Sequence, residues 1–182
     1  MKAKNTAAIL KALEQRIESH LQEAIAVYQN MQREDLLRPA ANGGWSIAQC
    51  LEHLNSYGDF YLPEIEKGIG RYKGNRALAA FKSTWLGNYF TQMMEPKAGM
   101  KKIKAFKGHI PGDDLDAHKV VADFIRQQEK LLQYVRSSAG ALNARIPVSI
   151  SRWIKLRLGD VLQFLIAHDE RHLVQAKRNV RG

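Results

Sequence analysis

The sequence predicts an all-α protein, a four-helix bundle in up-down-down-up order with a long crossover between the second and third helices. Apolar residues recur with a helical period in four long segments, at about 5–34, 46–62, 115–138 and 158–178. The segment between the second and the third of these, 68–111, is glycine-rich and basic. A connection of that length allows two successive helices to run parallel, which gives the predicted order.

The length and composition indicate one domain that spans residues 1–182. Its 182 residues are 45% hydrophobic and 25% charged, which is ordinary for a globular protein. No apolar run approaches the roughly 18 residues of a membrane span, and the N-terminus lacks the unbroken apolar core of a signal peptide. The single cysteine, Cys50, excludes an internal disulfide and is consistent with a reducing compartment. We therefore expect a cytoplasmic protein.

The chain is strongly basic, with a formal net charge of +10. Such a charge raises nucleic acid, a membrane surface or an anionic small molecule as partners. The densest group of cations lies in a connector that also contains Gly99 and Gly108: Lys97, Lys101, Lys102, Lys104 and Lys107. We interpret this group as a solubilising surface, because runs of charge usually form solvated faces. The chain also has no helix-turn-helix, zinc-finger or aromatic-basic signature of nucleic-acid binding. The expected partner is a small-molecule substrate, with no specific nucleic acid and no membrane.

The first two helices have recognisable starts. Asn5 or Thr6 is expected to cap the first, whose apolar positions are Ile9, Leu13, Ile17, Ala24, Val27 and Met31. Ser46 is expected to cap the second, with Gln49 completing a capping box. Pro63 falls inside the second pattern and is expected to kink or shorten that helix near Leu62.

The middle of the chain is expected to contain one shorter helix and one extended linker. The helical candidate covers about 78–94 and carries Phe81, Trp85, Tyr89 and Phe90. The third long helix follows 111–114, and Gly140 is a natural stop for it. Residues 144–157 include a β-like run, but Pro147 and the lack of a partner strand favour an extended linker over a sheet.

The fourth helix carries two histidines on its buried face. Residues 158–178 read LGDVLQFLIAHDERHLVQAKR, and one helical face holds Val161, Leu165, His168, His172 and Ala176. Side chains four residues apart on a helix have Cβ atoms about 5–6 Å apart, so two imidazoles at that spacing can bind one metal ion. The spacing alone permits such a site without establishing it, since core-facing histidines also occur as hydrogen-bonded packing residues.

The predicted topology brings a third histidine to the same level. In an up-down-down-up bundle, the start of the second helix and the end of the fourth share one end of the molecule, and His53 and His172 each lie about 10 Å from it. His20 is expected about 10 Å below that level. His118 lies near the start of the third helix, at the same end as the other histidines, and could lie around the metal or line the pocket. His109 is interpreted as a loop residue. A buried reduced cysteine is the favoured interpretation of Cys50, although a soft metal ligand there is conceivable.

Two motifs resemble those of the DinB/YfiT-like superfamily of metal-binding bundles. Residues 44–54, GWSIAQCLEHL, resemble the family's W-S-x-x-x-x-L-x-H-L entry to the second helix. Residues 167–175, AHDERHLVQ, resemble its A-H-x-x-R-H-x-x-Q in the fourth helix. The resemblance implies a single DinB-like domain in which His53, His168 and His172 are the metal ligands. It also implies one divalent ion, with zinc, nickel and iron all compatible with imidazole ligands.

The resemblance implies an enzyme with open coordination positions for water or substrate. The expected activity is that of a thiol-dependent S-transferase, which moves a low-molecular-weight thiol to a small electrophile. The alternatives are a metal-dependent hydrolase and a non-catalytic, stress-associated metal-binding protein. No residue of the sequence stands out as a general base. A homodimer is expected, because relatives often pair through bundle faces and one bundle does not obviously bury the aromatic residues of 81–90.

Three further residues in the motifs have structural interpretations. Trp45 is expected either to cover the metal end of the bundle or to serve as a hydrophobic staple. Asp169 and Arg171 point off the histidine face and are expected at the surface or in an interface.

Overall fold

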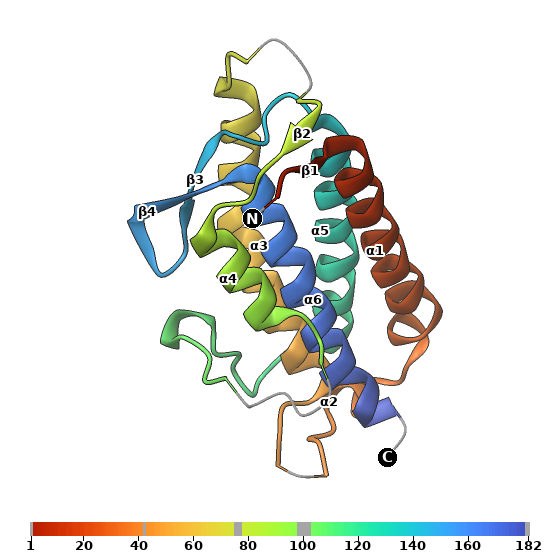
Figure 1. Cartoon of the computed structure of the whole chain (residues 1–182). Helices are drawn as coiled ribbons and strands as arrows, with labels where there is room; N and C mark the ends of the chain where they lie inside the picture. Colours follow the sequence, from red (N-terminus) through yellow and green to blue (C-terminus); the bar gives the residue numbers. More distant parts are fainter. Residues whose placement is uncertain (1, 42, 75–77, 98–102, 181–182) are drawn as a thin grey trace.

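The computed structural model describes residues 2–41, 43–74, 78–97 and 103–180 and is mostly helical, as predicted (Figure 1). The long helices are α1 (Thr6–Ala26), α3 (Ile47–Arg71), α5 (Ala117–Ser137) and α6 (Leu158–Val180). Shorter helices are α2 (Arg33–Leu37) and α4 (Trp85–Met94), with 3-10 turns η1 (Tyr28–Asn30) and η2 (Lys107–His109). The strands are β1 (Lys4–Asn5), β2 (Ala80–Phe81), β3 (Arg145–Val148) and β4 (Ser151–Arg157). Asn42, Gly99, Lys101 and Lys102, which the sequence placed in connectors, lie outside the described residues.

The four long helices pack side by side, with α1 and α6 running in one direction and α3 and α5 in the other (Figure 1). Hydrogen bonds tie the ends together. Leu158 N donates to Ala144 O at 2.8 Å, which joins the start of α6 to the segment after α5. Asn179 Nδ2 donates to Trp45 O at 2.9 Å, which joins the end of α6 to the start of α3. The start of α3 and the end of α6 therefore lie at the same end of the bundle.

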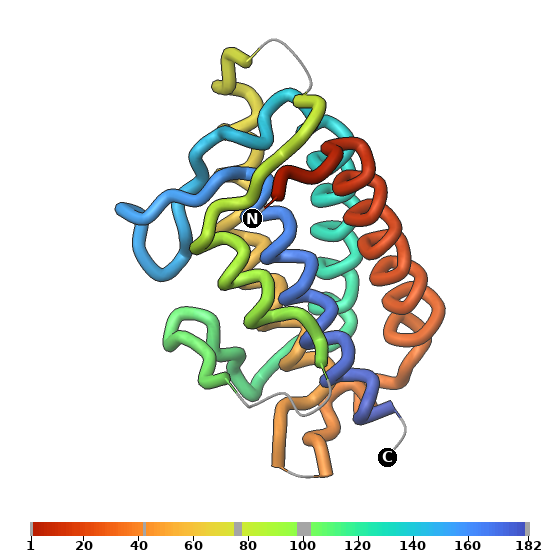
Figure 2. The backbone as a smooth tube through the Cα atoms, in the orientation of Figure 1, coloured from red at the N-terminus to blue at the C-terminus, as the bar shows by residue number. Residues whose placement is uncertain are grey.

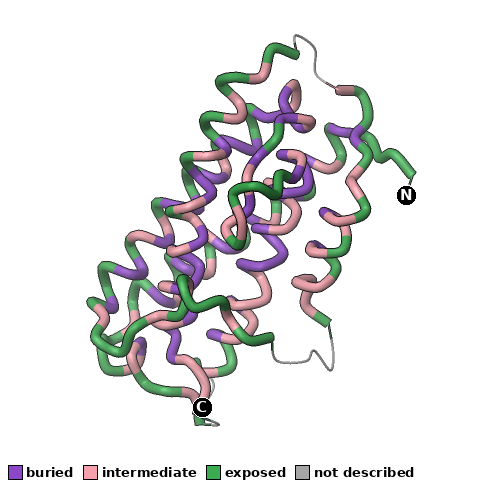
Figure 3. Tube along the Cα trace, turned by 90° about the vertical axis from the view of Figure 1, so that its left-hand side faces the viewer, coloured by how far each residue is buried: buried purple, intermediate pink, exposed green. Residues whose placement is uncertain are grey.

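The core lies between the inward faces of these helices, where buried and exposed residues alternate along each one (Figure 3). The crossover between α3 and α5 runs along the outside of α6, where α4 packs (Figure 2). Asp160 of α6 is fully buried, and its Oδ2 accepts hydrogen bonds from Thr84 N at 3.1 Å and Thr84 Oγ1 at 2.8 Å. Because Thr84 also caps α4, this carboxylate fixes the start of α4 against α6.

The boundaries of the first two helices differ from the prediction. Helix α1 ends at Ala26, and Asn30 Nδ2 donates to Ile25 O at 2.8 Å, so a side chain satisfies a carbonyl that a continuing helix would have used. Apolar residues continue beyond the end of the helix because the chain there still packs on the core, where Tyr28 and Leu36 are fully buried. Helix α3 runs past Pro63 to Arg71, so the proline does not shorten the helix near Leu62, which was one of its two expected effects. Core packing of Tyr61, Leu62 and Ile65 around the proline offsets the backbone hydrogen bond that it cannot donate.

The predicted linker at 144–157 is a two-stranded antiparallel sheet. The partner that the sequence seemed to lack is the next run of the chain, β4, and a register shift between Pro147 and Val148 accommodates the proline. Ile146 and Leu156 are buried against the bundle. The helical candidate at 78–94 begins later than predicted, because Ala80–Phe81 forms strand β2 beside β1 and the helix starts at Trp85.

Among the described residues, no helix combines the length and the apolar character needed to cross a bilayer.

Candidate metal centre

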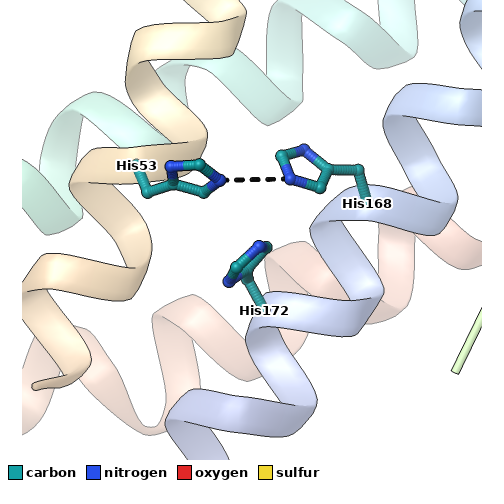
Figure 4. A group of neighbouring side chains, drawn as sticks. All are labelled: His53, His168 and His172. Atoms are coloured by element: carbon teal, nitrogen blue, oxygen red, sulfur yellow. Dashed lines mark hydrogen bonds between the residues drawn. The ribbon is translucent and has the colours of Figure 1, made fainter. Parts of the chain in front are cut away.

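The three predicted histidines come together inside the bundle (Figure 4). His53 comes from α3, and His168 and His172 come from successive turns of α6. Each offers one ring nitrogen, and these three atoms lie within 4.8 Å of one another. His53 Nε2 and His168 Nε2 are 3.2 Å apart. Two nitrogens on one tetrahedral ion lie about 3.4 Å apart at the usual metal–nitrogen distance, so this spacing suits a shared cation.

Local sequence signals place these side chains. Ser46 Oγ accepts from Gln49 N at 3.1 Å, and Gln49 Oε1 accepts from Ser46 N at 3.0 Å, so the predicted capping box starts α3. That start puts His53 on the second turn, facing the interior. On α6, the four-residue spacing of His168 and His172 puts both rings on the face that packs against α3.

A backbone carbonyl fixes the tautomer of His53. His53 Nδ1 lies 2.6 Å from His109 O, and because a carbonyl oxygen only accepts, the ring nitrogen must carry the proton. The lone pair of Nε2 then points toward His168 and His172. Metal-binding histidines commonly donate their second N–H to a backbone carbonyl in this way.

The other two rings have buried nitrogens that meet no partner. Among the described residues, His168 Nδ1 and His172 Nδ1 have no hydrogen-bond partner, which is costly for buried polar atoms. Burial lowers the pKa of His53 to about 4 and the pKa of His172 to about 3. Burial also lowers the pKa of His168 well below its ordinary value. All three rings are therefore neutral at pH 7, the form that binds a metal ion, and the donor set fits a divalent cation.

Aromatic side chains surround the cluster. The ring centroid of Trp45 lies 4.9 Å from that of His53 and 5.8 Å from that of His172. Phe164 stacks on His168 at 5.7 Å, and Tyr57 lies 4.5 Å from the same ring. These contacts restrict the histidine rotamers and keep the local dielectric constant low. Trp45 precedes the cap of α3 and also contacts two of the histidines, so it shares features of both interpretations of its role.

In the part of the chain that the structure describes, no carboxylate joins the cluster. Asp169, expected at the surface or in an interface, is buried within the chain instead, and its Oδ2 accepts from Gln128 Nε2 at 2.8 Å. Burial raises its pKa to about 7, since the low dielectric disfavours the charged carboxylate. Arg171 is partly buried and donates to Met93 O at 3.3 Å.

The remaining histidines and the cysteine lie outside the cluster. His20 Nδ1 lies 3.4 Å from Gln128 Oε1, so Gln128 bridges His20 and Asp169. Since α1 ends at Ala26, His20 is close to the end of its helix, at the level of the cluster instead of below it. His118 is exposed and lies outside the ligand group, so the possible role beside the metal is not supported. Cys50 is a buried free cysteine outside the ligand group, as the favoured interpretation predicted.

His109 is the site residue that the sequence analysis missed. Ser56 Oγ donates to His53 O at 2.7 Å, so the N–H of His109 Nδ1, 2.9 Å away, donates to this hydroxyl. The His109 ring also stacks on Tyr57 with centroids 3.9 Å apart. These contacts hold the carbonyl that orients His53. A histidine in a connector, 56 residues along the chain from His53, carries no spacing signal that could have revealed this role.

Comparison with known proteins agrees with the motifs. A family model described as the DinB superfamily matches residues 16–176. No curated protein matches the sequence. Among solved structures, the chain is similar to YfiT from Bacillus subtilis, described as a probable metal-dependent hydrolase with an unusual four-helix bundle topology. The TM-score is 0.56 at 14% identity over 97% of this chain and 86% of YfiT, a likeness that shows the fold alone.

Proposed function

The chain belongs to the DinB superfamily, and on that basis we propose that it is a metal-dependent enzyme whose divalent ion is held by His53, His168 and His172. The observation that supports this proposal is the convergence of three neutral imidazoles, two buried and one half-buried, with no carboxylate among them in the described residues. Three protein ligands are the pattern of catalytic sites, which keep positions open for water or substrate.

The surrounding residues prepare the site for such an ion. The carbonyl of His109 holds His53 in the tautomer whose Nε2 is free. Trp45, Tyr57 and Phe164 shield the rings from bulk water. A bound divalent cation would supply Lewis acidity, lowering the pKa of a thiol or water that it ligates.

We propose that the reaction is transfer of a low-molecular-weight thiol to a small electrophile. Neutral ligands leave the full charge of the ion in place, which favours ionisation of an incoming thiol near neutral pH. The strongly basic chain would also raise the local concentration of an anionic thiol. The superfamily also includes thiol-dependent transferases, which supports the same reaction.

Hydrolysis of an ester or amide is the second candidate. The description of YfiT as a probable metal-dependent hydrolase favours it. The same three-histidine donor set suits activation of water for this chemistry. Zinc, nickel and iron all accept such ligands.

One assay separates these reactions. Metal-loaded protein, chelated protein and a His53→Ala variant are supplied with several cellular thiols and a chromogenic electrophile, and separately with chromogenic esters and amides. His118→Ala is the matched control, because it removes an exposed imidazole outside the cluster. The transferase is supported if the metal-loaded protein and the His118→Ala control transfer the thiol, whereas the chelated protein and His53→Ala do not. Metal-dependent cleavage without thiol supports the hydrolase, and equal rates in all samples would leave a non-catalytic metal-binding protein.

We further propose that the protein is a cytoplasmic homodimer. Trp85 is 76% exposed and Tyr89 is 51% exposed on α4, a large aromatic surface for a single bundle. The buried free Cys50 suits a reducing compartment. Light scattering should give twice the 20.6 kDa chain mass. A monomer mass across a wide concentration range would rule the dimer out.

A further inference from the structure

A second site candidate lies at the other end of α3, in a cleft between this helix and the β3–β4 hairpin. The cleft has a volume of about 370 Å³, within the range of small-molecule sites. Its basic lining residues come from both elements: Lys67 and Arg71 from α3, and Arg145, Arg152 and Lys155 from the hairpin. In Figure 1 the hairpin projects from the bundle beside the second half of α3.

The fold builds this cleft through a close contact of backbone and side chain. A Cβ at Gly68 would lie 2.3 Å from Ile146 Cδ1, so the glycine lets the hairpin pack directly on α3. The strand register pairs Pro147 with Lys155, and Arg145 lies two residues before Pro147 on the same face. Cations that are about 80 residues apart in sequence therefore line one cleft.

Within the described residues, the protein neutralises only one of the five positive charges of the cleft. Glu64 is the one acidic residue in the described lining, and its carboxylate is paired with Lys67 at 2.8 Å. Among the described residues, Arg71, Arg145 and Lys155 form no ion pair. Arg16, by contrast, pairs with two glutamates.

We propose that this cleft binds a ligand that carries phosphate groups. Like charges gathered in one cleft repel one another, and an anion between them removes that repulsion. Guanidinium groups donate paired hydrogen bonds that match phosphate oxygens, and three of the five cations are arginines. Tyr72 adds an aromatic side to the lining, which suits an organic phosphate.

The cleft is separate from the histidine cluster. His53 and Lys67 are about 20 Å apart along α3 at the rise of an α-helix. The proposed anion site therefore does not depend on the proposed reaction, and a protein without enzymatic activity would still bind the ligand.

The phosphate could belong to a soluble molecule or to a lipid headgroup, and Trp153 distinguishes these sources. It lies on β4 next to Arg152 and is 94% exposed. At a lipid surface this indole would enter the interface, and its fluorescence would shift to shorter wavelength. A soluble phosphate in the cleft would leave Trp153 in water.

The test uses the full chain and inorganic pyrophosphate, with binding measured by calorimetry at low and at moderate salt. A parallel arm uses vesicles of phosphatidylcholine and phosphatidylserine in equal amounts. The cleft variant is Arg145→Ala with Arg152→Ala. The matched control is Lys11→Ala with Arg33→Ala, which removes two exposed cations far from the cleft.

Pyrophosphate binding that weakens at least tenfold in the cleft variant, but not in the control, supports the site with a soluble ligand. Vesicle binding with a Trp153 shift, lost in the same variant, supports it with a lipid headgroup. Equal weakening in both variants, or no binding of either probe, overturns the proposal. If the double variant unfolds, Lys155→Ala is measured by the same criteria.

Discussion

The two ends of α3 differ in the charge and burial of the side chains that could bind an ion. At its start, His53 joins two other imidazoles that are neutral because the protein buries them. At its end, Lys67 and Arg71 contribute to a cleft whose cations are exposed and charged. A chain with a net charge of +10 thus combines a proposed cation site with no charged ligand and a proposed anion site lined by five cations. The first depends on burial and lone pairs, and the second depends on the field at the surface.

The largest effect is expected at the buried end. The purified protein should bind about one divalent ion per chain, and His168→Ala or His172→Ala should abolish that binding because two imidazoles hold an ion poorly. Elemental analysis of protein purified without a nickel column measures it, and circular dichroism should show most of the helical signal retained. Full metal occupancy in both variants would refute the ligand assignment.

Acid should reveal the cost of burying neutral imidazoles. Burial lowers the pKa of His20 from its ordinary value of 6.5 to about 4. Between about pH 6.5 and pH 4, the unfolded state therefore binds a proton at His20 that the folded state does not bind. Stability should therefore fall as the pH drops from about 6.5 to about 4, with His20 contributing about 3 kcal/mol. Urea unfolding of metal-free wild type and His20→Gln across this range measures the contribution. Identical slopes would contradict it.

The contacts around His53 should have a smaller effect. Ser56→Ala removes the hydroxyl that holds the His109 ring, so the carbonyl that orients His53 should lose precision. Metal affinity should fall about tenfold, the lower end of the range for residues behind metal ligands. Ser137→Ala is a matched control, because Ser137 Oγ also donates to a helix carbonyl, Gln133 O, at 3.0 Å but lies far from the cluster. An equal affinity for both variants would show that His109 does not position His53.

The smallest effect is expected between the two ends. Arg71→Ala should change metal affinity by less than about twofold, since distant sites without shared partners contribute independently. Metal titration at one salt concentration, with wild type as the reference, tests this. A tenfold change would show that α3 couples the two sites and that the comparison of separate ends is wrong.

Features set by neighbouring residues could be predicted from the sequence. The capping box of Ser46 and Gln49 and the shared face of His168 and His172 depend on contacts within one helical turn, and both are present. The DinB motifs are local for the same reason. The end of α1 also depends on neighbouring residues, yet the predicted end was wrong. Apolar residues continue with a helical period through Tyr28, whereas the α-helical backbone ends at Ala26 and a 3-10 turn follows.

The sequence by itself therefore predicted the four long helices, though not all of their ends, and the three histidines that could share an ion. Only the tertiary structure decided that His109 orients His53, that Gln128 links His20 to Asp169, and that cations from α3 and the hairpin line one cleft. Helical periodicity and capping depend on residues a few positions apart, so they can be recognised in the sequence. Contacts between segments far apart in sequence depend on how whole elements pack, and no local pattern encodes that packing.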